Sequence, residues 1–210
     1  MARDTTTEAA GEASFVGAGF NGLAEGTGSF VGAGGGDAPS VSPGSGNIAN
    51  GTDSFVGAGD LNQIVTGGDG SFIGGGGSTF AGTRATTASN EISVVDAFIG
   101  VGDLNRTSSA GNGSVIAGGG YGWAYYDNTN FSNQITAEDS FIGAGDANTV
   151  AGSLAFVGSG EYNSIASSAV YSVVSGGYQN AQSGADGAIG GGLDSLISSS
   201  GKYAAIGRRL

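Results

Sequence analysis

The sequence predicts an all-β protein, a parallel β-solenoid or left-handed β-roll of about eleven rungs, on the strength of three observations. Forty-five of the 210 residues are glycine and only two are proline. A Val or Ile in a short apolar pair recurs eleven times. The nine residues SFVGAGDLN at 54–62 return as AFIGVGDLN at 97–105 and as SFIGAGDAN at 140–148. Short strands separated by glycine turns at such a period are typical of a solenoid.

The recurring apolar pair is expected to form one strand of each rung. Its second residue is always β-branched: Val16, Val31, Val56, Ile73, Ile99, Ile116, Ile142, Val157, Val174, Ile189 and Ile206. Its first residue is Phe in seven rungs and otherwise Val115, Val173, Ala188 or Ala205. We therefore expect a row of aromatic side chains that tapers to Ala toward the end of the chain.

A second strand is expected in each rung where an Asn comes two residues before an aliphatic residue. Examples are Asn62/Ile64, Asn90/Ile92, Asn133/Ile135, Asn148/Val150 and Asn163/Ile165. Each plain unit of 15 to 17 residues then holds two short strands and two turns, with no helical period. Equivalent strands of such rungs stack about 4.8 Å apart.

The spacing between rungs explains the repeated nine-residue motif. Between Val56 and Ile142, spacings of 17 and 26 residues alternate, so a 43-residue module contains one plain and one enlarged rung. The extra residues lie near 36–45, 77–87 and 121–131, always between a glycine turn and an Asn strand. Insertions at one phase of a solenoid are expected to form loops on one side. We expect residues 1–13 to be an N-terminal tether or arm and residues 14–210 to be the repeat domain.

Composition and charge exclude several classes of function. A net charge of −12 lacks the basic footprint of a nucleic-acid-binding protein. The chain has no Cys and no His, which removes thiolate chemistry and the commonest general base and zinc ligand. It also has no apolar run of about 18 residues, so we expect no membrane insertion. No cofactor is expected.

The acidic residues favour turns over metal binding or catalysis. Asp60, Asp103 and Asp146 share one phase of the repeat and resemble calcium ligands of nonapeptide repeats. Such repeats need Asp on consecutive rungs, whereas these recur on every second rung, so we expect them to cap their own turns. Glu138 and Asp139 are adjacent, which does not place two carboxylates across a sugar as a glycosidase requires. We therefore expect neither a metal site nor a catalytic residue.

Strand geometry predicts that the Phe row faces a partner. Successive side chains of a strand point to opposite faces, so the Phe row and the Val/Ile row cannot both fill one thin coil. Burying one Phe contributes about 1.5–3 kcal/mol, and a line of exposed Phe would be unlike the surface of a soluble monomer. The alternative is a flattened coil with Phe inside and Val/Ile under the inserted loops. The predicted subunit interface comprises Phe15, Phe30, Phe55, Phe72, Phe98, Phe141 and Phe156.

The third insertion carries an aromatic cluster around the single Trp. Its members are Tyr121, Trp123, Tyr125, Tyr126 and Phe131. Aromatic groups on a projecting loop suit stacking on sugars or docking on a protein surface, because they combine apolar area with a polar tip. The alternative is that they cap a rung or pack against a neighbouring subunit.

The segment YSVVSGGYQNAQSGADGAIGGGLDSLISSSGKYAAIG at 171–207 resembles the head repeats of trimeric autotransporter adhesins and related repeats in bacteriophage fibre proteins. The resemblance covers roughly 14–207 and implies a left-handed parallel β-roll that is stable as a tight homotrimer. The chain departs from the adhesins in its Phe row and its regular insertions. It also lacks a visible secretion signal, stalk and membrane barrel.

Two functions follow from the resemblance. In the first, the chain is a structural, non-enzymatic protein of a virus particle, as a short fibre, spike or capsid decoration whose first dozen residues tether it to the virion. In the second, it is the head of a bacterial surface adhesin that binds glycan or matrix. The Met1 start and the missing signal favour the virion. A host-surface glycan or protein is a further expected partner in either case.

Replacing Trp123 and Tyr125 with Ala should separate recognition from packing. If the cluster recognises a surface, the variant should keep the thermal stability of the native oligomer and lose attachment to host cells. Lowered stability with unchanged attachment would contradict recognition. Differential scanning calorimetry and a cell-adsorption assay measure the two quantities.

Overall fold

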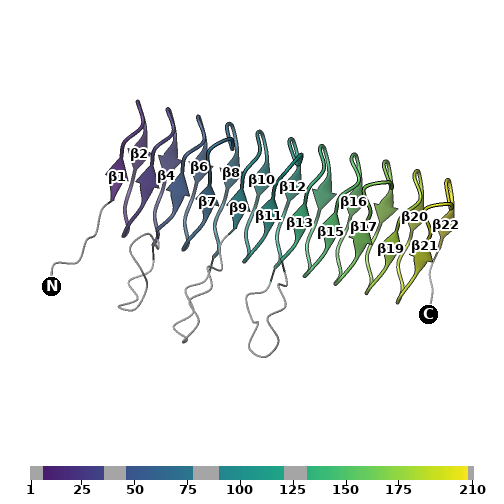
Figure 1. Ribbon diagram of the computed structural model, residues 1–210. Helices are drawn as coiled ribbons and strands as arrows, with labels where there is room; N and C mark the ends of the chain where they lie inside the picture. Colours follow the sequence, from purple (N-terminus) through teal and green to yellow (C-terminus); the bar gives the residue numbers. More distant parts are fainter. Residues whose placement is uncertain (1–6, 36–45, 78–89, 121–131, 208–210) are drawn as a thin grey trace.

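Two long parallel sheets face each other across a narrow core in the computed structural model (Figure 1). It describes residues 7–35, 46–77, 90–120 and 132–207. Every strand has two residues, and successive strands alternate between the sheets, so equivalent strands stack in register along a rod. These described ranges contain no helix, and therefore none that could cross a membrane. The predicted parallel β-solenoid is confirmed.

Each sheet has eleven strands. We call the odd-numbered strands the Asn sheet, because an Asn comes before most of them: β1 (Glu8–Ala9), β3 (Leu23–Ala24), β5 (Ile48–Ala49), β7 (Gln63–Ile64), β9 (Glu91–Ile92), β11 (Arg106–Thr107), β13 (Gln134–Ile135), β15 (Thr149–Val150), β17 (Ser164–Ile165), β19 (Ala181–Gln182) and β21 (Leu196–Ile197). The even-numbered strands form the Phe sheet: β2 (Phe15–Val16), β4 (Phe30–Val31), β6 (Phe55–Val56), β8 (Phe72–Ile73), β10 (Phe98–Ile99), β12 (Val115–Ile116), β14 (Phe141–Ile142), β16 (Phe156–Val157), β18 (Val173–Val174), β20 (Ala188–Ile189) and β22 (Ala205–Ile206).

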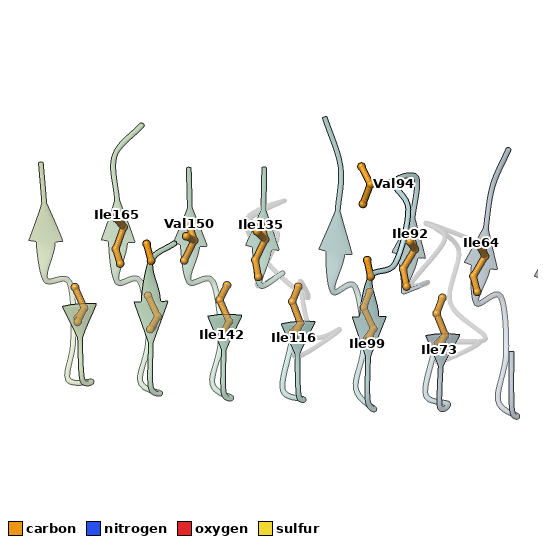
Figure 2. Packing of buried hydrophobic residues seen from close by; sticks show 14 of the residues in the cluster. Ile64, Ile73, Ile92, Val94, Ile99, Ile116, Ile135, Ile142, Val150 and Ile165 are labelled. Carbon is orange, nitrogen blue, oxygen red and sulfur yellow. The ribbon is translucent and has the colours of Figure 1, made fainter. Parts of the chain in front are cut away.

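The core is a double row of aliphatic side chains between the sheets. Figure 2 shows Ile64, Ile92 and Ile135 of the Asn sheet opposite Ile73 and Ile99 of the Phe sheet, and all five are fully buried. Each row comes from the second residue of its strands, because the first residue points outward. The predicted Val/Ile core is therefore confirmed, and the alternative with Phe inside the coil is wrong.

A ladder of buried asparagines satisfies the backbone at one corner of the rod. Its members are fully buried: Asn47, Asn62, Asn90, Asn105, Asn133, Asn148, Asn163 and Asn180. At Asn163 the backbone N–H and Nδ2 both donate to Asn148 Oδ1, at 3.1 and 3.0 Å. Nδ2 also donates to the carbonyls of Ser159 and Gly177, at 3.2 and 3.0 Å. The ladder fixes the register of the rungs, because a slipped rung would leave these buried groups without partners.

The opposite corner, which we call the left-handed corner, also turns through the left-handed conformation, as the Asn corner does at Leu61 and Leu104. Asp53, Asp96 and Asp139 have φ of 51–53°, and the equivalent glycines on the alternate rungs have φ of 66–67°. The two residue types alternate along the rod in the order Gly28, Asp53, Gly70, Asp96, Gly113 and Asp139. A Cβ on any of the three glycines would lie 2.3–2.5 Å from Oδ1 of the Asp on the next rung. The two-rung module thus has a packing reason, because each Asp occupies the space that its Gly neighbour leaves.

The three internal gaps in the described chain begin at the same corner of the rod. The backbone N–H groups of Gly35, Gly77 and Gly120 each donate a hydrogen bond to a glycine carbonyl of the next rung, at 2.9–3.0 Å; the acceptors are Gly59, Gly102 and Gly145. The residues that follow, 36–45, 78–89 and 121–131, lie outside the described part of the chain. The predicted insertions therefore stay predictions.

The paired structure begins inside the range predicted as an N-terminal arm. Strand β1 lies within residues 1–13 and pairs with β3, with Glu8 opposite Leu23 and Ala9 opposite Ala24. Residues 1–6 are outside the described ranges. A tether formed by this segment would therefore have to be shorter than thirteen residues.

Replacing Asn163 with Ala should destabilise the rod by about 3 kcal/mol or more, because it leaves several buried donors and acceptors unpaired. Asn112 is a matched control: it is exposed, and its Oδ1 accepts one hydrogen bond, from the Val95 N–H at 3.2 Å. Asn112→Ala should cost less than about 1 kcal/mol. Urea unfolding measures both losses, and equal losses would contradict a structural role of the ladder.

Candidate interaction surface

A ladder of stacked phenylalanines runs along the outer face of the Phe sheet. Phe15, Phe30, Phe55, Phe72 and Phe98 occupy one register position on five consecutive rungs. Phe141 and Phe156 continue the row after a gap. Neighbouring ring centroids are 4.7–5.2 Å apart, and the ring planes agree within 15°. All seven predicted interface residues therefore lie in one line.

The rings lie over glycines of their own rungs. Each Phe of the ladder is followed two residues later by Gly, whereas Ala117 and Ser175 follow Val115 and Val173. A Cβ on any of these seven glycines would lie 3.2–3.4 Å from Cε1 of its ring. The carbonyl oxygen of the next rung would be closer still, at 2.2–2.4 Å, so glycine avoids contacts with both the neighbouring backbone and the ring. The ladder and its glycines form a smooth apolar strip.

Stacking determines which part of each ring can meet a partner. Because neighbouring rings stack along the rod, their faces cover one another and their edges point away from the sheet. A sugar stacks on an exposed aromatic face, whereas an edge suits packing against other apolar side chains. The Phe ladder is therefore better suited to contact with protein than with a glycan.

The ladder has a large exposed surface in the single chain. Phe15, Phe98 and Phe156 are 53, 37 and 40 % exposed, and the other ring side chains are half-buried by their neighbours in the row. Exposed apolar strips of this kind mark interaction surfaces. The outward orientation that the sequence predicted is confirmed, and the partner that covers it stays a prediction.

The row is interrupted once and then tapers. Val115 pairs with Phe98 on one side and Phe141 on the other, so one small side chain sits between two rings. After Phe156 the same position holds Val173, Ala188 and Ala205. We expect an interface along this row to be wider at the N-terminal part of the rod than at the C-terminal part.

The acidic residues singled out in the sequence lie at the two corners. Asp60, Asp103 and Asp146 share the corner at which the three gaps in the described chain begin, and the rung between each pair contributes Gly77 or Gly120 there. Within the described ranges, no group of three or more acidic residues is arranged to hold a metal ion.

The adjacent carboxylates Glu138 and Asp139 lie at the left-handed corner. The carbonyl of Glu138 accepts hydrogen bonds from Ser140 Oγ and from the N–H of Leu154, at 3.0 and 3.1 Å. Asp139 fills the space beside Gly113. The Asp139 side chain therefore has a packing role at this corner.

One predicted aromatic group is not described by the structure, and another group that was not predicted lies on the surface. The aromatic cluster Tyr121, Trp123, Tyr125, Tyr126 and Phe131 lies outside the described residues. Sequence reasoning did not find a row of exposed side chains at the left-handed corner, formed by Leu154, Tyr171 and Tyr203. Aligning the turns as well as the strands would have placed these residues in one column.

Comparison of the chain with protein-family models, with curated proteins and with solved structures finds no match. The fold and the surface therefore rest on the chain's own residues.

Asp103 gives a pH-dependent test of its corner. Burial raises the pKa of its carboxyl above the ordinary value of 3.8, against a hydrogen bond from the Gly77 backbone that lowers it. A raised pKa in the folded state means that Asp103 lowers stability as pH rises through that pKa. Asp103→Asn should therefore raise the unfolding midpoint near pH 7 relative to the native chain, and this gain should shrink toward about pH 3. A gain in thermal midpoint that is equal at both pH values would contradict burial as the cause.

Proposed function

We propose that the chain is a non-enzymatic structural protein of a virus particle, a short fibre, spike or capsid decoration built by self-association along the Phe ladder. The observation that carries this proposal is the row of seven outward-facing rings, interrupted only at Val115, on an acidic rod. Its place is the virion, where the N-terminal segment attaches it to the larger assembly.

A second copy of the same chain fits the ladder better than an unrelated partner. In a parallel homo-oligomer every rung meets its own equivalent, so ring edges, the Val115 gap and the taper to Ala205 match without further adjustment. Two ladders then bury most of their apolar area over many rungs. The resemblance to trimeric head repeats supports three copies.

The polar side chains of the rod recur at equivalent positions of successive rungs and are not gathered in one site. Asp60, Asp103 and Asp146 recur on every second rung, and the hydrogen bonds of the Asn ladder hold backbone groups of the chain itself. A catalytic site needs different groups held around one reacting atom. This repetition supports a structural role.

The alternative is the head of a bacterial trimeric adhesin located at the cell surface. The resemblance of residues 171–207 to adhesin head repeats favours it, as do the aromatic residues of segment 121–131. Both functions share the homotrimer and attachment to a host surface. Measuring the copy number of the chain in purified particles separates them, because only a virion component is present at a fixed stoichiometry per particle.

Replacing Phe55, Phe98 and Phe141 with Ser should convert a heat-resistant oligomer into an unfolded or aggregated monomer. Each replacement should remove about 3–5 kcal/mol per chain if the ring is buried between copies. The matched control replaces Asp60, Asp103 and Asp146 with Asn, at the same two-rung spacing, and should leave the oligomer intact with or without chelator.

Sedimentation velocity measures both triple variants and the native chain. A monomeric native chain, or a Phe-to-Ser variant that stays oligomeric, would contradict assembly along the ladder. Dissociation of the native oligomer by chelator would show that a metal ion takes part in assembly. Loss of the oligomer in the Asp-to-Asn control would point to the corner as the interface.

A further inference from the structure

The left-handed corner changes character in the last third of the rod. From Gly28 to Asp139 this column holds only Gly and Asp, but Leu154, Tyr171 and Tyr203 occupy it later. Their φ values are 54°, 56° and 57°. The three side chains are 48, 60 and 79 % exposed. Large apolar or aromatic groups thus stand in solvent at positions that elsewhere need small or polar residues.

Their backbone is held in the same way as that of the Asp residues they replace. The N–H groups of Tyr171 and Tyr203 donate to the carbonyls of Ser153 and Ala185, both at 3.1 Å, just as the Asp96 N–H donates to Asp69 at 2.9 Å. A bulky residue in the left-handed region costs roughly 1 kcal/mol or more, and the rod carries such residues at both corners, as at Leu61 and Leu104. The high exposure of the tyrosines shows that packing within the chain does not compensate this cost.

Tyr171, Asp186 and Tyr203 stand on three consecutive rungs of this column. The two tyrosines are therefore two rungs apart, about 9.6 Å at the usual strand spacing. Asp186 lies between them at φ 55° and is exposed. Unlike the Phe ladder, this row has a carboxylate on the rung between the two rings, so the tyrosines do not stack on each other and both stay exposed.

We propose that Tyr171, Asp186 and Tyr203 form a binding site for a neutral, extended oligosaccharide. Each tyrosine supplies an aromatic face on which one sugar ring stacks, and the Asp186 carboxylate accepts hydrogen bonds from sugar hydroxyls between them. The separation of the tyrosines is close to the length of two sugars in an extended β-linked chain. This site does not depend on whether the rod belongs to a virus or to a cell surface.

The size and charge of the row select this ligand class. Two ring side chains and a carboxylate are far too small for a stable protein interface, which buries about 800 Å² on each partner. The acidic rod, with a net charge of −12, repels anionic polymers such as nucleic acid or sulfated glycans. A neutral glycan needs no large contact area and is not repelled by the acidic rod. One site of this size binds with about millimolar affinity, and several copies in an oligomer strengthen it by avidity.

Titration of the full chain with cellohexaose, followed by saturation-transfer NMR, tests the site. Tyr171→Gly and Tyr203→Gly should each weaken binding at least tenfold, and the double variant should not bind. Because Gly adopts the left-handed conformation freely, the unfolding midpoints of these variants should be unchanged or higher. Asp186→Asn should weaken binding several-fold while the fold is kept.

The matched control is Tyr162→Gly. Tyr162 also has a left-handed backbone, with φ of 56°, but lies at the opposite corner. Its ring packs edge-on against the ring of Tyr178, with the two centroids 5.7 Å apart. Its variant should bind cellohexaose as the native chain does. Binding by the Tyr171→Gly/Tyr203→Gly double variant, or a native chain that does not bind at tens of millimolar, would overturn the proposal. Equal binding of maltohexaose, whose α-linked chain is curved, would overturn the match to an extended glycan.

Discussion

The whole structure depends on parallel, in-register stacking of strands that are only two residues long. One rung alone has too few hydrogen bonds and too little apolar area to fold, so each rung needs its neighbours. The Asn ladder enforces this stacking at one corner, because each buried side chain binds the rung before and the carbonyls beside it. The ladder thereby fixes the register along the rod, so equivalent residues of successive rungs line up in columns.

The residue types in each surface column decide which partners that surface suits. Phe on consecutive rungs covers its own faces and leaves an edge ladder, which favours protein contact. Tyr171 and Tyr203, separated by Asp186, are exposed and do not stack on each other, and these are the side chains that we propose bind a sugar. Aromatic side chains in this rod therefore either stack on each other or stay apart, and the residue on the rung between them decides which. A single rod can carry an assembly surface and a recognition surface without a pocket.

The strands and the core could be predicted from the sequence because both follow strict periodicities. Alternation within each strand placed Val16 to Ile206 inside and the Phe row outside, as found. Exceptions that depend on three-dimensional neighbours could not be predicted. Gln182 occupies an aliphatic core position because Gly187 leaves room for it, and its Nε2 donates to Ser172 Oγ at 3.2 Å. The left-handed tyrosines were missed because turn residues carry no periodic apolar signal.

Hydroxyl-radical footprinting with mass spectrometry tests most directly whether the Phe ladder is covered by another copy. Phe98 and Phe20 are the same residue type and have similar exposure in the single chain, 37 and 42 %, but only Phe98 lies in the ladder. If copies associate along the ladder, Phe98 should be oxidised many-fold more slowly than Phe20 in the native protein. Comparable oxidation of the two side chains would contradict self-association through this surface.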